Sequence, residues 1–145
     1  MTTIAHERGA GRAHPRGSPG RHWAFVFAGG ATGAAIRAGF EKAVPTGVGE
    51  FPWPTLSVNA VGTFVLAWTA TRLAQHPNPR ERAFLISGFC GGLTTFATVQ
   101  LELVKMLDDG EGWLALGYAA ASIAVGLVAA RLAVTYAQAR VEARR

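Results

Sequence analysis

GFCGGLTTFATVQLE, residues 88–102, is apolar enough to lie inside a membrane, yet it contains two adjacent glycines, three threonines and a glutamate. Paired glycines followed by Leu-Thr-Thr-Phe weaken a helix, and a bilayer offers no water to the backbone groups that are released. A broken helix therefore survives at membrane depth only where it is buried in protein or lines a cavity. Its freed carbonyls and amides can then bind ions. The stretch predicts a membrane helix that is interrupted near Gly91–Thr95 and forms part of an ion site.

The rest of the chain contains further uncharged runs. Phe51–Thr71, Ala83–Leu101 and Gly112–Ala130 are each 19 to 21 residues long, which is about the length that crosses a bilayer at ~1.5 Å per residue. A shorter run, Trp23–Ile36, continues past Arg37. These runs lack the alternation of polar and apolar faces that is typical of soluble bundles. We therefore expect an all-α integral membrane protein with four transmembrane helices, of which the third is broken.

The distribution of Lys and Arg along the chain predicts the tails and the topology. Residues 1–21 form a Gly/Pro/Arg-rich tail for which disorder is favoured over nucleic-acid binding. Residues 22–138 form the expected four-helix domain, and residues 139–145 form a basic C-terminal tail. Ten Lys and Arg residues fall on the side of both termini and the second connection, against two on the opposite side. The positive-inside rule then predicts a multi-pass protein of the cell membrane with both termini in the cytoplasm.

Two polar residues in the first two runs are candidates for function. Arg37 either pairs with Glu41 one turn further on or forms a cationic mouth that attracts anions. Asn59 is either a hydrogen-bonding residue between helices or an amide donor that faces a pore. The spacing of these residues leaves both alternatives open.

The last two runs carry a more clustered set of polar residues. Thr95, Thr98 and Glu102 share one face of the third helix. An ionisable residue such as Glu102 within a membrane is a functional hypothesis by default, with an interfacial anchor as the alternative. In the fourth helix Tyr118 and Ser122 are four residues apart, so their hydroxyls either line a polar track or bond to the backbone of their own helix.

The small residues indicate close helix packing. Gly29 and Gly33, and also Gly88 and Gly92, are spaced so that helix backbones can approach one another. Four short helices bury little surface, so a dimer is expected. The histidines lie in the tail or in a loop, and no nucleophile–base pair or Cys/His metal spacing is present in the sequence. We therefore expect no enzymatic activity, and the lone Cys90 is expected to be a buried small residue.

Three segments together resemble the Fluc-type fluoride channels of the CrcB family. They are GGATGAAIRAGFE at 29–41, TLSVNAVGTF at 55–64 and the stretch at 88–102, and the resemblance covers about residues 23–137 in order. It implies a bacterial channel that exports cytoplasmic fluoride and so relieves fluoride toxicity. It also implies an antiparallel dimer in membrane lipid, with two pores and a structural Na⁺ at the centre of the dimer.

The resemblance further implies roles for individual residues. The carbonyls of Gly91 and Thr94 would bind Na⁺ together with their counterparts across the dimer. Asn59 would donate to fluoride, Phe96 would present the positive edge of its ring, and Arg37 would lie in a charged vestibule. The polar wall of the pore would comprise Thr95, Thr98, Tyr118 and Ser122.

The chain departs from the family pattern at one pair of positions. Val99 stands where the family commonly has a second Phe, and Gln100 stands where it commonly has Ser. A homodimer with antiparallel subunits also needs a chain that inserts in both directions, whereas this chain has a strong bias to one orientation. Together these departures predict pairing with a homologous second subunit that has the opposite bias. The alternative is a homodimer that tolerates Val99.

Two other classes of protein compete with a channel. A small multidrug or proton-coupled transporter also has four short helices, but it needs an acidic residue midway along its first helix, where this chain has Arg37. A membrane scaffold that transports nothing would explain the glycines but not the polar residues around the break.

Overall fold

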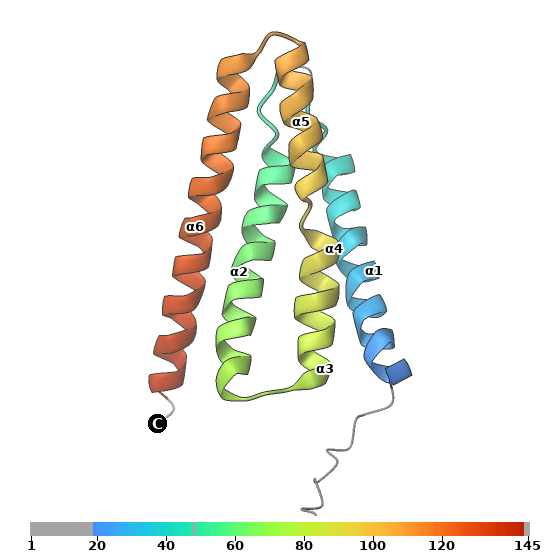
Figure 1. Ribbon diagram of the computed structural model, residues 1–145, viewed down its shortest axis with the longest axis vertical. Helices are drawn as coiled ribbons and strands as arrows, with labels where there is room; N and C mark the ends of the chain where they lie inside the picture. The colour runs from blue at the N-terminus through green and yellow to red at the C-terminus, as the bar shows by residue number, and fades with distance from the viewer. Residues whose placement is uncertain (1–18, 48, 144–145) are drawn as a thin grey trace, which may run out of the picture.

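The computed structural model describes residues 19–47 and 49–143, and all the regular elements within these ranges are helical. Those residues form four long rods that stand side by side (Figure 1), and the third rod is made of several pieces. The elements in chain order are α1 (Pro19–Ala43), α2 (Trp53–Gln75), α3 (Pro79–Glu81), the π-helical segment η1 (Arg82–Cys90), α4 (Gly91–Leu93), α5 (Phe96–Asp108) and α6 (Gly112–Glu142).

The rods run alternately up and down (Figure 1). The start of α1, the turn between α2 and α3, and the end of α6 lie together at one end of the molecule, while the other two connections lie at the opposite end. The count of ten Lys and Arg residues against two assumed this arrangement, with both termini and the second connection on the same side. α1 begins at Pro19 and α6 continues to Glu142, so the helical region extends slightly beyond residues 22–138. Residues 1–18 of the predicted tail lie outside the described residues.

Two of the rods are both long enough and apolar enough to cross a membrane by length and composition. They are the third rod, Pro79–Asp108, and Gly112–Glu142. α1 and α2 have 25 and 23 residues, which exceeds the roughly 20 residues that a crossing needs, but they are less apolar. The regular structure of the described residues is thus all-helical, with helices that could span a membrane.

Glycines hold α1 against the first half of the third rod. A Cβ added at Gly88 would lie 2.5 Å from the Val26 carbonyl oxygen and 3.0 Å from the Gly29 Cα. Cβ atoms at Gly29, Gly33 and Gly92 would likewise collide with backbone atoms of the other helix. The small residues that the sequence singled out therefore pack against one another within a single chain. Cys90, in the same region, is 2% exposed, as predicted.

We expect Gly88→Ala to destabilise the protein by about 1–3 kcal/mol, because backbone atoms cannot move aside as a flexible side chain would. The matched control is Gly117→Ala on α6, where an added Cβ meets no atom within 4 Å. This control should be neutral or stabilising by up to about 1 kcal/mol, since Ala has the higher helix propensity. Thermal unfolding in detergent measures both variants. Equal midpoints would contradict the close approach of the two helices.

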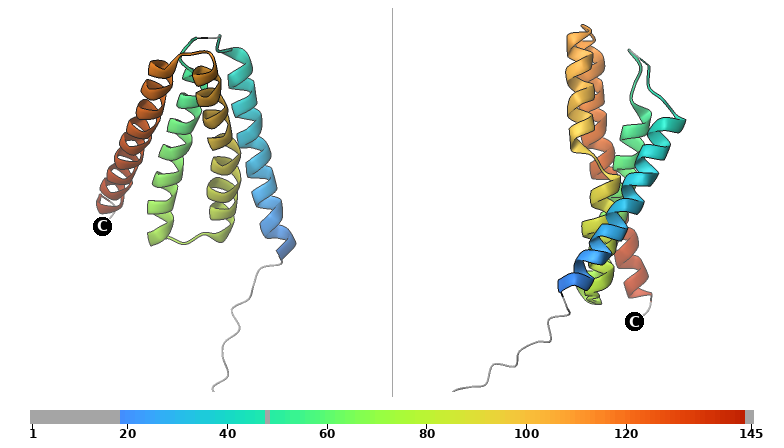
Figure 2. Two further views of the ribbon diagram at one scale, coloured as in Figure 1. Left: turned by 45° about the horizontal axis from the view of Figure 1, so that its top comes forward. Right: turned by 90° about the vertical axis from the view of Figure 1, so that its right-hand side faces the viewer.

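The third rod changes its packing partner at the break. Its first half, η1 and α4, packs against α1, whereas α5 packs against α6 and stands away from the upper end of α1 (Figure 2, right). A small core forms there from Leu56, Met106, Ala115 and Tyr118. The break therefore lies where the rod passes from one neighbour to the other.

Candidate functional site

The third rod is interrupted at Thr94 and Thr95, which both have extended backbone angles (φ/ψ of −81°/147° and −142°/113°). Gly91 and Gly92 remain helical, so the break comes just after the paired glycines and within the predicted segment. Thr95 caps α5, because its Oγ1 accepts a hydrogen bond from the Thr98 N–H at 3.1 Å. The two hydroxyls also lie 2.8 Å apart. Threonine is a favoured N-cap residue, so the sequence itself restarts the helix here.

Asn59 bridges the break from α2. Its Oδ1 accepts a hydrogen bond from the Thr95 N–H at 2.8 Å, and its Nδ2 donates to the Thr95 carbonyl at 3.2 Å. Asn59 thus satisfies the Thr95 N–H, which the break frees and a bilayer would otherwise leave unpaired, and it adds a second bond to the carbonyl of the same residue. The amide nitrogen carries two hydrogens, and a single one of them is used within the described structure. The bridging role is therefore compatible with donation to an anion.

One face of α2 contacts the broken third rod. Thr55, Asn59 and Gly62 lie at i, i+4 and i+7, which places them on the same side of the helix. Thr55 is bound to Glu102, Asn59 to Thr95, and Gly62 lies where any side chain would meet the Thr94 methyl group. The sequence reasoning missed Thr55, although its position four residues before Asn59 was a usable signal.

Arg37 reaches the break from α1. Its Nε donates to the Gly92 carbonyl at 3.3 Å, and its Nη1 lies 3.3 Å from the Glu41 carboxylate. In a continuous helix the Gly92 carbonyl would accept from the Phe96 N–H, which now lies beyond the break. The Glu41 pairing that the spacing allowed is therefore present. Arg37 also stabilises the C-terminal end of α4, a role that its sequence position did not suggest.

Glu102 is the centre of a hydrogen-bonded triad. Its carboxylate accepts from the Thr55 hydroxyl at 2.6 Å and from the Tyr118 hydroxyl at 2.7 Å. Thr55 is 2% exposed and Tyr118 is fully buried. Charge-assisted hydrogen bonds of this kind are about twice as strong as neutral ones. They join α2, α5 and α6, so Glu102 does more than anchor a helix end.

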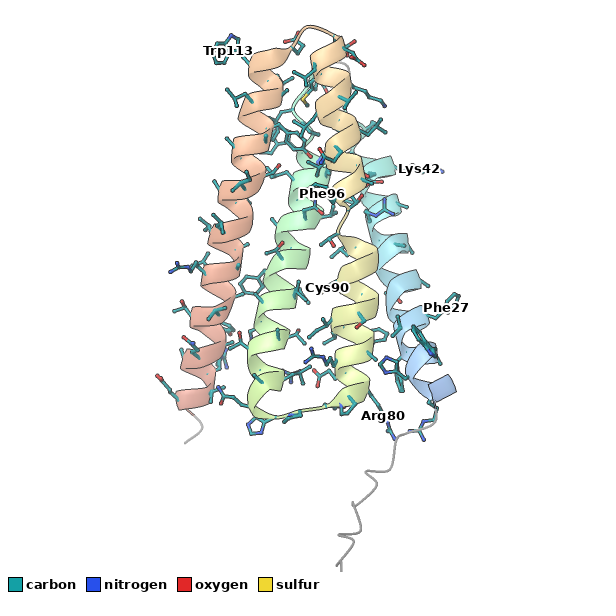
Figure 3. The ribbon with its side chains drawn as sticks, viewed as in Figure 1. Phe27, Lys42, Arg80, Cys90, Phe96 and Trp113 are labelled. Atoms are coloured by element: carbon teal, nitrogen blue, oxygen red, sulfur yellow. The ribbon has the colours of Figure 1, made fainter. Side chains whose placement is uncertain are left out.

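The remaining predicted residues are not all brought together. Phe96 is 76% exposed at the start of α5, where Figure 3 labels it. Val99, about one turn further along α5, packs against the core cluster that contains Leu56 and Tyr118. The Ser122 hydroxyl is buried and has no hydrogen-bond partner among the described residues. A single chain thus assembles the polar residues around the break but leaves Phe96 without an opposing wall.

The implied Na⁺ site can be tested against the backbone at the break. In a continuous helix the Gly91 carbonyl would accept from the Thr95 N–H, and the Thr94 carbonyl from the Thr98 N–H. Both donors are diverted, to Asn59 Oδ1 and to Thr95 Oγ1 respectively. Carbonyl oxygens are the hard ligands that such a cation prefers. The backbone carbonyls of Gly91 and Thr94 therefore fit the implied Na⁺ site. Among the described residues no cluster of three His, Cys, Asp or Glu side chains is present that could hold a metal ion.

Comparison with known proteins supplies the family. The model for the CrcB-like proteins (camphor resistance, CrcB) matches residues 24–134. The chain belongs to the CrcB family. Among its relatives is the fluoride-specific ion channel FluC 1 of Mycolicibacterium paratuberculosis, which is 44% identical over 115 residues, covering 78% of this chain and 87% of the relative.

Two further relatives come from other bacteria. The fluoride-specific ion channel FluC 2 of Rubrobacter xylanophilus is 40% identical over 119 residues, which cover 75% of this chain and 76% of the relative. FluC 1 of Bradyrhizobium diazoefficiens is 36% identical over 110 residues, which cover 73% and 77% respectively. The family match over residues 24–134 includes α2, the third rod with its break, and most of α1 and α6.

Proposed function

We propose that this protein is a fluoride-selective ion channel of the membrane that lets cytoplasmic fluoride out and so relieves its toxicity. The observation that carries this proposal is family membership together with relatives named as fluoride-specific channels at up to 44% identity. The protein is accordingly a channel and not an enzyme. The competing transporter and scaffold interpretations have no support among these relatives.

The chemistry around the break suits a small anion. Fluoride holds its hydration water strongly, so a dry pore must replace that water with several donors at close range. Asn59 keeps one amide hydrogen, the Thr95 and Thr98 hydroxyls lie together, and the N-terminus of α5 carries the positive end of a helix dipole. In the proposed pore Tyr118 and Ser122 extend this polar wall along α6, and Arg37 lies in the vestibule.

Flux from purified protein in liposomes tests the proposal. Fluoride efflux measured with a fluoride electrode should be rapid, whereas efflux of chloride from matched liposomes should not exceed the leak of protein-free vesicles. Equal efflux of the two anions would contradict selectivity, and a fluoride rate equal to that of empty vesicles would contradict channel function.

The functional unit is proposed to be an antiparallel dimer with two pores. Phe96 and Gly91 are both exposed in the single chain, although the resemblance gives both of them a role at the site. A second subunit that covered this surface would supply the missing wall. Because Val99 and the charge bias set this chain apart, the partner is proposed to be a homologous subunit of opposite orientation.

Expression of this chain alone tests the pairing. In cells that lack their own fluoride channels, we expect resistance to fluoride only when a homologous second subunit is co-expressed. Full resistance from this chain alone would establish a competent homodimer instead.

Both termini are proposed to be cytoplasmic in a multi-pass plasma-membrane protein. A thiol reagent that cannot cross the membrane should label Asp109→Cys from outside intact cells, and should not label Asn78→Cys at the opposite end of the rods. Equal labelling of the two would show that the chain inserts in both orientations. The buried Cys90 serves as the unreactive internal background.

The Na⁺ ligands are proposed to be the carbonyls of Gly91 and Thr94 and those of the partner. A bound Na⁺ would offset the dipoles of the freed carbonyls at the dimer centre. Because these ligands are backbone atoms, Thr94→Ser should have little effect. Gly91→Leu should reduce dimer stability, although an added Cβ there meets nothing within 4 Å inside the chain.

The measurement is the thermal midpoint of the dimer in Na⁺ and in a large organic cation. We expect a lower midpoint in the organic cation for the unmodified protein and no such difference for Gly91→Leu. The control Gly112→Leu, at another position with open space around it, should keep the Na⁺ dependence. An equal thermal midpoint of the unmodified protein in Na⁺ and in the organic cation would contradict the proposed Na⁺ site.

A further inference from the structure

A groove opens between α2, the α2–α3 turn and α6, at the end of the molecule where α1 begins. It encloses a volume of about 1260 Å³. Figure 3 marks this end by Arg80, which lies beside the groove but does not line it. The residues of the wall that carry charge or aromatic rings are Trp68, Arg72, His76, Glu81, Tyr136 and Arg140.

Two arginines in the wall are held in place by aromatic rings. The Arg72 guanidinium lies 5.1 Å from the centre of the Trp68 ring, and Arg140 lies 5.1 Å from the centre of the Tyr136 ring. Arg140 Nη2 also donates to the Tyr136 hydroxyl at 2.5 Å. Stacking of this kind fixes the guanidinium planes before any ligand arrives, which lowers the entropy cost of binding.

The donors of these arginines are only partly used. Arg72 forms an ion pair with Glu81, but its Nε is buried and has no hydrogen-bond partner within the described residues. A buried donor without an acceptor destabilises a folded protein and indicates a missing partner. Two arginines against one glutamate also leave the wall with a net positive charge when His76 is neutral. The missing partner is therefore expected to be an anion.

The surroundings of the groove indicate which anion. Tryptophan and tyrosine are enriched where a membrane meets water, and this groove contains one of each. Along α6, one and two turns from Tyr136 toward the middle of the helix, Leu132 and Val128 are 60% and 58% exposed. An apolar strip thus runs from a cationic groove toward the middle of the membrane. A free phosphate ion would use only the groove, whereas a phospholipid would use both.

We infer that this groove binds the headgroup of an anionic phospholipid. Arg72 and Arg140 hold the phosphate, which supplies the acceptor for Arg72 Nε, and the acyl chains lie along Leu132 and Val128. Basic pockets between membrane helices recognise acidic headgroups in this way. The inference requires that the protein lie in a membrane, and it is independent of the ion that the protein conducts.

Native mass spectrometry of the purified full-length protein tests the inference, with phosphatidylglycerol and phosphatidylcholine as probes. The protein should retain phosphatidylglycerol in preference to phosphatidylcholine. R140Q and R72Q/R140Q should each lose about tenfold or more of that retention, since charge-assisted hydrogen bonds are the strong ones. E81Q should increase it, because it frees Arg72 from a competing carboxylate. A purely structural role for these residues would not produce an increase in phosphatidylglycerol retention in E81Q.

The matched control is R80Q/R82Q, which removes the same two charges at the same end of the molecule from residues outside the groove. It should keep the preference for phosphatidylglycerol. Equal losses in both double variants would overturn the inference in favour of general surface charge. Equal retention of the two lipids, with phosphatidylglycerol displaced by inorganic phosphate, would overturn it in favour of a free-anion site. R140Q keeps the Arg72–Glu81 pair, so the test remains decisive even if R72Q/R140Q does not fold.

Discussion

Asn59→Asp is expected to reduce fluoride flux by about thirtyfold or more, because two losses of roughly 1–3 kcal/mol each combine and ~1.4 kcal/mol is a factor of ten. The first loss is structural: Nδ2 now donates to the Thr95 carbonyl at 3.2 Å, and a carboxylate oxygen in its place would repel that carbonyl. The second is electrostatic, since a negative charge at the break opposes the entry of an anion.

The liposome flux assay measures this effect, and Asn78→Asp is the matched control. Asn78 caps α3 by accepting from the Arg80 and Glu81 N–H groups, and aspartate is an equally good cap. The control makes the same chemical change at the end of the molecule and should keep normal flux. If Asn59→Asp also shows normal flux, Asn59 neither lines the pore nor supports the break.

Phe96→Ile should also abolish most of the flux, but for a different reason and without harm to the protomer. The ring is 76% exposed, so its replacement costs the single chain little packing. An aromatic ring edge carries partial positive charge, whereas an aliphatic side chain offers an anion nothing comparable. We expect a loss of about tenfold or more, which corresponds to roughly 1.4 kcal/mol or more at the barrier.

Phe27→Ile provides the comparison for this second change. Phe27 lies on α1 and is 78% exposed, so the two substitutions remove the same ring from equally exposed sites. Flux through Phe27→Ile should stay near normal, and both variants should unfold near the temperature of the unmodified protein. An equal loss of flux in the two variants would indicate a general effect of exposed aromatic rings.

Much of the helical architecture could be predicted because it depends on short windows of sequence. Apolar runs of membrane length form helices wherever they occur, so Phe51–Thr71 and Gly112–Ala130 became α2 and α6. The break was also a local property, since glycines weaken the rod and Thr95 can cap a new helix. The structure places the break after the paired glycines, since Gly91 and Gly92 remain helical.

The partners of the polar residues could not be predicted in the same way. Asn59 and Thr95 are 36 residues apart, and Arg37 and Gly92 are 55 apart. No periodicity links positions at such separations, so the sequence left two interpretations open for Asn59 and two for Arg37. The structure adds a role at the break to each of them, and it adds Thr55 as a partner of Glu102.

The sequence by itself thus determined where the chain is helical, where the third rod is interrupted and how Thr95 caps the helix that follows. Those outcomes follow from backbone propensity and hydropathy, which act between neighbours in the chain. Only the tertiary structure decided which side chains of other helices take up the freed backbone groups: Asn59 for the Thr95 N–H and Arg37 for the Gly92 carbonyl. The physical reason is that a hydrogen bond needs two atoms within about 3 Å, and the packing of α1 and α2 against the broken rod is what brings them there.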